Sequence, residues 1–572
     1  MTTTTVLPII AGGIIAALLL QRGWRRLELS RAKHRSLTGH ARWARRFAAL
    51  VPFYEYSEEE FFRADDAPEE VATQRRAAFK RLAALYSQRF AKSAQANANV
   101  DGMVSDLQFT ARYRVPFQFS SYVRRHLKAG SFLESSSGPR VKDLDGNELY
   151  DLTGSYGVNV FGYDFYKGCI ERGSERVKAL GPVLGSYHPV LAYNVRRLKA
   201  ISGLDEVSFH MSGTEAVMQA VRLARYHTRR DKLVRFCGAY HGWWGDVQPG
   251  VGNPMTERNT YTLKDMDDAA LRVLRNRSDI ACVLVNPLQA LHPNASAPGD
   301  STLIDSGRKA HFDRAAYTAW LGKLREVCTA RNIVLIFDEV FVGFRLALGG
   351  AQEYFDVAAD MVTYGKTLGG GLPVGVLCGR AQFMRRFRED RPADFCFARG
   401  TFNSHPYVMG AMHEFLLALE SEPMLARYRA LDEVWNGRAA RLNERLRAAN
   451  LPVQVANLSS IWTLKYTRPS RYNWMFQYYL RAEGLALSWV GTGRLIFSLD
   501  YTDADFGHVA DRIVAAAAAM NGDGWWWQGV GLTNRAIRSR VLREILRARG
   551  LARASGRSAP LSADGAAPSS RA

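Results

Sequence analysis

The sequence predicts an α/β fold with a mainly parallel sheet in the middle of the chain, and two observations support this prediction. The chain has 572 residues, 47% of them hydrophobic, so it can bury a large core and form more than one domain. Between residues 151 and 420, short apolar runs such as "EVSFHM", "CVLVNP", "NIVLIFDEV" and "DMVTYGK" alternate with segments of helical periodicity. This alternation is typical of parallel strands joined by helices, and ligands of such sheets collect at the carboxyl ends of the strands.

The chain begins with an apolar segment that predicts a membrane anchor. Residues 1–21 carry no charged side chain, and most of them belong to the run "VLPIIAGGIIAALLL". As a helix rising ~1.5 Å per residue, this segment reaches about 30 Å, the thickness of a bilayer core. Arginines follow it, so the positive-inside rule predicts a single-pass anchor with the downstream chain in the cytoplasm. An interfacial helix and a cleaved targeting piece are the alternatives, because Pro8 and the glycines weaken a span.

The formal net charge of +21 lies largely at the two ends of the chain. Between residues 22 and 46, many Arg and Lys stand against a single acid, Glu28, and the end of the chain is similarly basic. Both basic ends lie beside apolar or aromatic features, which favours an anionic membrane surface over a nucleic acid as partner. Residues 22–100 are expected to form a basic and then charged helical linker, and no nucleic-acid partner is expected.

Residues 523–572 form a Trp-rich, basic amphipathic tail. The stretch "GWWWQGV" precedes "NRAIRSRVLREILRARG", in which Ile537, Val541 and Ile545 recur at helical spacing. Adjacent tryptophans and flanking arginines are typical of a membrane interface. The pattern leaves two interpretations open, a second membrane contact and a terminal helix docked on the protein with a solvated basic face.

The six cysteines show no pairing pattern. They are scattered over the middle of the chain without any Cys-x-x-Cys pair or metal-ligand spacing. This distribution predicts a reduced, cytosolic domain without a metal site.

The stretch "TYGKTLGGGLPVG" contains a single lysine, Lys366. Its Gly-Lys-Thr sequence is similar to part of a nucleotide-binding loop. A Walker loop needs a glycine five residues before the glycine of Gly-Lys-Thr, and that position holds Asp360. The other glycines, residues 369–371, come after the lysine instead. The order excludes a Walker loop and leaves covalent chemistry as the alternative for Lys366.

A phosphate site fits better at "HMSGTEAVMQAVRLARYH". Here Ser212, Gly213 and Thr214 form the turn between a predicted strand and a predicted helix. Gly213 lets the backbone approach closely, while free amides of the first helical turn and the Thr214 hydroxyl can hold a phosphate. Ser-Gly-Thr before a helix is usually only a cap, so this turn needs support from other residues.

The run "VLIFDEVFVGFR" supplies that support, because it places Asp338 at the mouth of a buried strand. An unpaired buried carboxylate is costly, so Asp338 needs a partner. A pyridinium nitrogen would supply one, and Lys366 would supply a Schiff base. In "AYHGWWG", Tyr240 and His241 occur beside tryptophans, where a ring can stack on a planar cofactor.

With these features in this order, the chain resembles the class III aminotransferases of fold type I, especially glutamate-1-semialdehyde aminomutase-like members. The blocks that carry the resemblance are "DLDGNELYDLTGSYGVNVFGY", "SGTEAVMQAVRLAR", "DEVFVGFR", "GKTLGGGLPVG" and "GTFNSHP", between about Phe132 and Ala519. It implies an aspartate-aminotransferase-like fold, with a large pyridoxal-phosphate-binding domain over residues 151–420. Residues 101–150 and 421–522 would form the smaller α+β domain.

The resemblance also assigns roles to single residues. Lys366 would form the Schiff base with pyridoxal 5'-phosphate, and Asp338 would pair with the pyridine nitrogen and keep it protonated. The other cofactor-binding residues would be Ser212, Gly213, Thr214, Tyr240, His241 and Thr401, with Tyr240 stacking on the ring and His241 in a structural rather than a catalytic role. Thr401 would reach the phosphate from the neighbouring subunit of a homodimer. Ser155 and Tyr156 match positions near the substrate.

Three departures from the family pattern concern substrate specificity. Asn286 stands where the family usually has Glu before Pro, and Phe341 stands where many aminotransferases have Gln near the cofactor hydroxyl. The usual Gly-His-x-His-Pro after the "GSYG" block is "GYDFYKG". These changes leave the cofactor-binding set intact but weaken any transfer of substrate specificity.

The favoured function is transfer of an amino group from an amine or amino-acid donor to a carbonyl acceptor, with Lys366 moving the proton. The predicted anchor suggests a lipid-like or membrane-delivered acceptor. One alternative is an aminomutase of the glutamate-1-semialdehyde type, which needs no external acceptor. Another is a membrane-attached, non-catalytic scaffold that retains the fold, although the intact Asp338 and Lys366 argue against it.

Overall fold

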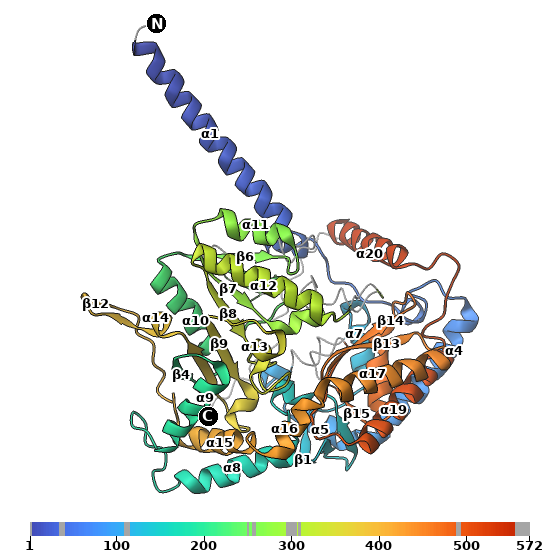
Figure 1. Ribbon diagram of the computed structural model, residues 1–572. Helices are drawn as coiled ribbons and strands as arrows, with labels where there is room; N and C mark the ends of the chain where they lie inside the picture. The colour runs from blue at the N-terminus through green and yellow to red at the C-terminus, as the bar shows by residue number, and fades with distance from the viewer. Residues whose placement is uncertain are drawn as a thin grey trace, which may run out of the picture.

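A seven-stranded sheet forms the centre of the larger of two lobes (Figure 1). The structure, a computed structural model, describes residues 3–33, 41–107, 115–248, 251–253, 255, 259–292, 306, 310–487 and 493–554. The strand order is β4-β10-β9-β8-β7-β5-β6, and only β10 runs antiparallel to its neighbours. The strands are β4 (Glu206–His210), β5 (Lys232–Phe236), β6 (Thr260–Leu263), β7 (Ile280–Val285), β8 (Val334–Asp338), β9 (Met361–Gly365) and β10 (Gly375–Gly379). The predicted α/β fold with a mainly parallel sheet is confirmed.

Both faces of this sheet are buried, which is why its strands appear in the sequence as continuous apolar runs. In β8, Val334 and Ile336 pack into a core shared with α10 (Gly213–Thr228), whereas Leu335 and Phe337 pack into the core shared with α12 (Arg314–Arg331). Successive side chains of a strand point to opposite faces, so one apolar run serves both cores. Each such side chain contributes about 2 kcal/mol by burial.

The other elements of the larger lobe cover these faces and supply its loops. They are η2 (Gly154–Gly157), α8 (Tyr163–Val177), α9 (Val190–Ser202), α11 (Asp268–Asn276), η3 (Pro287–Leu291), α13 (Gly350–Phe355), η5 (Lys366–Gly369), α14 (Ala381–Met384), β11 (Phe387–Arg388), β12 (Arg391–Phe395) and α15 (Pro406–Ala418). The antiparallel pair of β11 and β12 projects from the lobe at the left of Figure 1.

The smaller lobe contains two short sheets and a separate apolar core. One sheet has the order β1-β2-β3-β15 and the other β13-β14-β16. Its elements are β1 (Leu133–Ser137), β2 (Arg140–Asp143), β3 (Glu148–Asp151), α16 (Glu422–Arg429), α17 (Leu431–Ala448), β13 (Val453–Leu458), β14 (Ile461–Tyr466), η6 (Asn473–Met475), α18 (Phe476–Ala482), β15 (Leu485–Ala486), β16 (Arg494–Ile496) and α19 (Asp503–Gly522).

Segments from both ends of the chain pack into this second core. The N-terminal helices of this lobe are α3 (Glu58–Phe62), α4 (Glu69–Arg89), α5 (Ala91–Asn99) and α7 (Phe117–His126), and α4 lies along the smaller lobe in Figure 1. By contrast, α2 (Ala41–Ala48) reaches the larger lobe, where its Arg45 donates a hydrogen bond of 2.6 Å to the Asn253 carbonyl. On α4, the guanidinium of Arg75 is fully buried, pairs with Asp65 at 2.7 Å and lies over the ring of Trp525. Trp525 and Trp526 are themselves buried. Two of the three adjacent tryptophans are therefore core residues of the smaller lobe.

The helix after these tryptophans, α20 (Asn534–Ala554), is docked on the protein. Its Ile537 and Val541 are buried, and its Glu544 pairs with the buried Arg471 at 2.7 Å. Of the two interpretations that the sequence leaves open for the tail, the docked terminal helix is the one observed. Part of the apolar stripe of the helix therefore packs on the chain itself, whereas Leu542 and Leu546 are each 57% exposed.

The predicted membrane anchor at residues 1–21 is wrong. Within the described ranges, we find no helix with both the length and the apolar character needed to cross a bilayer. The physical reason lies in α1 (Thr3–Ala32), whose apolar run from Val6 to Leu20 covers only about 22 Å at ~1.5 Å per residue, against about 30 Å for a bilayer core. The membrane localisation predicted from this anchor is also wrong, and the membrane partner and lipid-like acceptor lose their support.

The basic half of α1 contacts the larger lobe instead. Ala32 is buried, and its carbonyl accepts a hydrogen bond of 2.9 Å from the Lys264 amide. Asn276, at the end of α11, donates a hydrogen bond of 2.7 Å to Glu28. The end of α1 therefore packs beside α11, and the rest of the helix projects from the body (Figure 1).

Candidate active site

The carboxyl ends of β4, β8 and β9 lie at one edge of the large sheet. Gly375, the first residue of β10, pairs with His210 at the end of β4 and with Gly365 at the end of β9. Asp338, at the end of β8, pairs with Thr363 of β9. This register brings the Ser212–Thr214 turn, Asp338 and Lys366 to the same edge, where α/β proteins bind ligands.

Asp338 is buried and hydrogen-bonded at both carboxylate oxygens. His241 Nδ1 lies 2.7 Å from Oδ2, so a protonated Nδ1 donates to this oxygen. The Val340 amide and the Thr363 hydroxyl donate to Oδ1 at 3.2 and 3.3 Å. These contacts hold the carboxylate in place from three sides, and an oxygen with two lone pairs can still accept a further donor.

Lys366 begins η5 directly after β9, with a left-handed φ of 48° that places its side chain off the strand. Its Nζ lies 4.4 Å from the ring centroid of Phe341. Burial lowers the pKa of Lys366 to about 7, although the charge of Asp338 opposes this shift. The amine is consequently available in its neutral, nucleophilic form near neutral pH.

The Ser212–Thr214 turn packs against the other site segments. The Ser212 hydroxyl accepts a hydrogen bond from the Glu215 amide at 3.3 Å and so caps α10. A Cβ on Gly213 would lie 2.5 Å from Val340, and one on Gly242 would lie 2.5 Å from the Thr214 hydroxyl. The glycines therefore permit a close approach of three segments, and the first amides of α10 have no acceptor within the helix.

Tyr240 and its turn are held beside Asp338 by a residue that departs from the family pattern. The Asn286 side chain donates a hydrogen bond of 3.0 Å to the Tyr240 carbonyl and accepts one from the Leu288 amide at 3.1 Å. The Tyr240 side chain is 59% exposed. Partial burial and the charge of Asp338 raise the pKa of Tyr240, whose neighbour His241 binds that carboxylate.

Ser155 and Tyr156 lie in η2, a turn that packs against Lys366. A Cβ on Gly157 would lie 2.7 Å from the Phe341 ring and 3.4 Å from Lys366 Cδ. Ser155 and Tyr156 both have left-handed φ angles, 43° and 56°. Such backbone is costly for residues other than glycine and concentrates at functional sites.

Thr401 is the one predicted site residue that does not join this group within a single chain. It lies on an exposed turn before α15. Among the described residues, it forms no hydrogen bond with the Ser212–Thr214 turn or with Lys366. Three aromatic residues near it in the sequence are exposed to solvent: Phe395 by 59%, Phe397 by 69% and Phe402 by 50%.

Sequence reasoning missed Arg494 on β16. Its positive charge contributes to lowering the pKa of Lys366, and β16 contacts η2, the turn that packs against this lysine. Burial lowers the pKa of Arg494 itself to about 10, and its Nε is buried without a hydrogen-bond partner among the described residues. The only sequence signal was an arginine at the start of the apolar stretch "RLIF", which short strands tolerate for many reasons.

Arg345 differs from Arg494, because its hydrogen bonds join the two lobes. Its Nη1 donates to the Ser460 hydroxyl at 2.9 Å and to the Phe497 carbonyl at 2.6 Å, and its Nη2 donates to the Asn159 carbonyl at 3.0 Å. Burial lowers the pKa of Arg345 to about 10. These contacts give Arg345 a structural role at the junction behind the site.

The group as a whole fits a phosphorylated, cationic aromatic ring. Asp338 can pair with a protonated ring nitrogen, Lys366 can attack a carbonyl carbon as a neutral amine, and the Ser212–Thr214 turn can bind a phosphate. Tyr240 can lie against the ring face.

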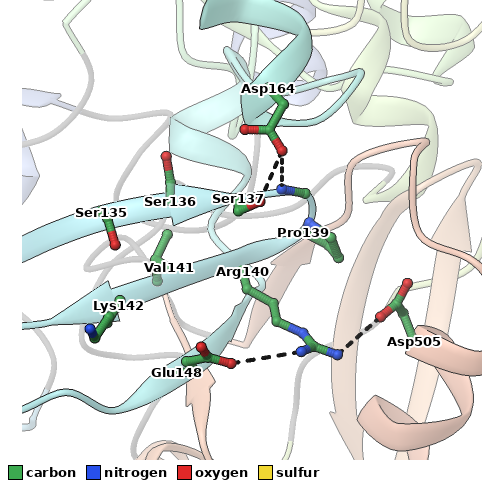
Figure 2. A pocket seen from close by; sticks show the side chains of 11 residues that line it. Ser135, Ser136, Ser137, Pro139, Arg140, Val141, Lys142, Glu148, Asp164 and Asp505 are labelled. Atoms are coloured by element: carbon green, nitrogen blue, oxygen red, sulfur yellow. Dashed lines mark hydrogen bonds and ion pairs between the residues drawn. The ribbon is translucent and has the colours of Figure 1, made fainter.

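A hollow that is separate from the candidate site residues lies between the β1–β2 hairpin and the start of α8 (Figure 2). Its volume is about 410 Å³. Figure 2 shows that Arg140 pairs with Glu148 and Asp505, at 3.7 and 3.5 Å, while Asp164 accepts hydrogen bonds from the Ser137–Gly138 turn. Its arginine is thus neutralised locally, and none of the candidate site residues lines it.

The chain is similar to one family over more than half of its length. The sequence model of the family described as "Aminotransferase class-III" matches residues 122–248 and 313–517. A glutamate-1-semialdehyde 2,1-aminomutase from Geotalea daltonii is 31% identical over 396 residues, covering 65% of this chain and 85% of the relative. The enzyme of the same name from Alkaliphilus oremlandii is 33% identical over 342 residues, covering 56% and 74%.

Solved structures show the same likeness. A transaminase with PLP bound has a TM-score of 0.62 and 25% identity, covering 76% of this chain and 99% of that one. A glutamate-1-semialdehyde-aminomutase from Pseudomonas aeruginosa PAO1 has a TM-score of 0.63 at 19% identity, covering 78% and 99%. An omega-transaminase from Sphaerobacter thermophilus has a TM-score of 0.58 at 24% identity, covering 69% and 92%. At these identities, the last two likenesses concern the fold alone.

Proposed function

Because the chain belongs to the class III aminotransferases, a family of enzymes that depend on pyridoxal 5'-phosphate, we propose that it transfers an amino group from an amine or amino-acid donor to a carbonyl acceptor. The bound cofactor supplies a carbonyl carbon for covalent capture of the amine and a ring that withdraws electrons from the reacting carbon. The observation that carries the proposal is the placement of Lys366, with its lowered pKa, at the same sheet edge as the buried Asp338.

In this proposal, each residue of the site has its own role. Lys366 would hold the cofactor and, as a neutral amine, would take up or release the proton at the α-carbon of the donor. Asp338, oriented by His241, keeps the ring nitrogen protonated. The free amides of Gly213 and Thr214 bind the phosphate at the positive end of α10.

Arg494 adds a requirement on the substrate. The Nε of Arg494 is buried without a hydrogen-bond partner among the described residues, and a buried cationic donor is costly unless a ligand pairs with it. Its closeness to Lys366 suggests that it pairs with a carboxylate of the donor or acceptor. This role favours amino acids and keto acids over simple amines and aldehydes.

An aminomutase is the second candidate function, because the curated relatives carry that name at 31–33% identity. The two reactions differ in stoichiometry. A transferase that meets a donor without an acceptor releases one carbonyl product per subunit and stops. An aminomutase converts the same substrate continuously, because nitrogen only moves between neighbouring carbons.

The test therefore presents the loaded, purified enzyme with single amino acids, with and without a keto acid, and counts carbonyl product per subunit. We expect one equivalent without an acceptor and many with one. Continuous isomerisation without an acceptor would favour the aminomutase. Absence of a cofactor absorbance band that depends on Lys366 would remove both and leave a non-catalytic scaffold.

We also propose that the enzyme is a homodimer in which Thr401 completes the partner's phosphate site. The exposed Phe395, Phe397 and Phe402 beside Thr401 support an interface with a second copy, because exposed apolar patches of this kind mark contact surfaces. A site shared between subunits has a direct genetic test.

Co-expressed Thr401→Ala and Lys366→Ala chains form mixed dimers, which differently tagged subunits allow to be purified. If Thr401 acts across the interface, one site per mixed dimer keeps both wild-type residues, so we expect about half of the wild-type activity. The Thr401→Ala homodimer should bind the cofactor about 10- to 100-fold more weakly, because a hydrogen bond to a charged group is lost. Mixed dimers no more active than the Thr401→Ala homodimer would place Thr401 in the phosphate site of its own chain.

A further inference from the structure

Behind η2, three side chains form a hydrogen-bonded series that the proposed reaction does not use. The Tyr163 hydroxyl donates to Asp151 Oδ2 at 2.7 Å, and the Ser155 hydroxyl lies 2.9 Å from the same tyrosine oxygen. Asp151 is buried, and its other oxygen accepts a hydrogen bond from the Thr153 amide at 2.8 Å. The series runs from a buried carboxylate to the turn beside Lys366.

The direction of the protons in this series follows from the number of hydrogens available. Burial and the charge of Asp151 raise the pKa of Tyr163, so the phenol keeps its single proton, which it donates to the carboxylate. The tyrosine oxygen can then only accept from Ser155. The hydroxyl hydrogen of Ser155 is thereby committed to Tyr163, and its lone pairs remain.

The turn that carries Ser155 is positioned to use those lone pairs. Gly157, two residues along, packs against Lys366 Cδ and the Phe341 ring. Consecutive Cα atoms are 3.8 Å apart, so the Cα of Ser155 lies at most about 7.6 Å from that of Gly157. Ser155 is partly exposed, and its amide is bound to the Thr153 hydroxyl at 3.0 Å, which holds the turn in its left-handed form.

We propose that Asp151 and Tyr163 are positioning residues that make Ser155 a hydrogen-bond acceptor toward the substrate. The substrate would accordingly carry a hydrogen-bond donor, a hydroxyl or a second ammonium group, a few bonds from the amine that reacts. A carboxylate or an ether oxygen at that place would face lone pairs and bind poorly. This inference rests on the proposed function, because it assigns the substrate class of the same site.

Tyr163 belongs to the "GYDFYKG" segment, which replaces the Gly-His-x-His-Pro pattern of the family. A neutral histidine also has one hydrogen, but its two nitrogens can exchange the roles of donor and acceptor. A phenol bound to a carboxylate has no such freedom. The tyrosine in this chain therefore fixes the Ser155 hydroxyl as a donor toward Tyr163 and as an acceptor toward the substrate.

The test compares hydroxy-amino acids and amino alcohols of increasing chain length, each against its own O-methyl ether. The ether keeps the acceptor oxygen and loses the donor. Binding to the cofactor-loaded enzyme is measured by titrating the cofactor absorbance in mildly alkaline buffer, because burial raises the pKa of Asp151 and a higher pH favours its carboxylate form. This readout gives a dissociation constant even for compounds that are not turned over.

For the best-bound chain length, we expect the wild-type enzyme to prefer the alcohol over the ether about tenfold. Tyr163→Phe frees the Ser155 hydrogen, so the preference should fall below about threefold, and Ser155→Ala should abolish it. Tyr150→Phe is the matched control: it makes the same chemical change one residue before Asp151, on a tyrosine that contacts Arg140 and Asp505 instead. This control should keep the wild-type ratio.

Equal binding of alcohol and ether by the wild-type enzyme overturns the inference, and so does binding of neither at any chain length. A ratio that survives Tyr163→Phe also overturns it. Loss of the proposed function gives a different result: the alcohol–ether ratio persists in the titration, but no amino group reaches a keto acid. The two proposals can therefore fail separately.

Discussion

Replacing Lys366 by alanine is expected to reduce amino transfer at least about 10⁴-fold and to remove the absorbance band of covalently held cofactor. The side chain has two proposed duties, covalent attachment of the cofactor and proton transfer. The measurement is a rate of keto-acid formation together with an absorbance spectrum of the purified protein. Lys323→Ala, on the exposed side of α12, is the matched control and should retain both signals.

Two further measurements separate these duties. Small primary amines added to the Lys366→Ala variant should restore part of the rate if proton transfer is the missing step. In the wild-type enzyme freed of cofactor, reattachment should speed up as pH rises to about 7 and then level off, because burial lowers the pKa of Lys366 to about 7. Arg494→Met removes a nearby positive charge. This removal favours the protonated form of the Lys366 amine, so the pH profile of reattachment in the variant should shift to higher pH. A rate that keeps rising toward the ordinary lysine pKa of 10.5 would contradict this account.

Asp338→Asn is expected to lower the transfer rate about 10³-fold while leaving the cofactor attached to Lys366. The amide keeps the shape of the carboxylate but loses the negative charge that holds a ring nitrogen protonated. Without that charge, the ring withdraws electrons less effectively from the reacting carbon. The measurement is the transfer rate of protein whose cofactor content equals that of the wild type.

The adjacent Glu339 offers a matched control for this substitution. Burial raises the pKa of Glu339 to about 8, and its carboxyl accepts a hydrogen bond of 2.7 Å from the Ala351 amide. Glu339→Gln makes the same chemical change one residue away and should leave the rate within about threefold, since the side chain is already close to neutral. An Asp338→Asn enzyme as active as this control would contradict the role proposed for Asp338.

Membrane association was the part of the sequence prediction that failed. A membrane-spanning helix must be apolar and must also be long enough to cross the bilayer core. The run from Val6 to Leu20 is apolar and uncharged, but it is too short. The tryptophans of the tail left both a membrane contact and a docked helix open for a related reason. Composition does not distinguish an interface between water and lipid from the core of a protein, and Trp525 and Trp526 belong to the core.

The position of Arg494 near the site was equally impossible to predict from the sequence. Arg494 acts on the pKa of Lys366 from a short strand of the smaller lobe, far from Lys366 in the sequence. No spacing rule links the two residues, since their closeness depends on how the lobes pack. The series of Asp151, Tyr163 and Ser155 is local in sequence, yet its polarity only appears when the hydrogen-bond partners are known.

The sequence by itself determined the α/β class, the family, the cofactor and the candidate pair of Asp338 and Lys366. These follow from local patterns, because a polar residue that ends an apolar strand must lie at the carboxyl edge of a parallel sheet. Only the tertiary structure decided where α1 and α20 lie, which arginine is close to Lys366 and which way Ser155 presents its hydroxyl. Those properties depend on desolvation and on contacts between distant segments, and neither is encoded in the spacing of residues along the chain.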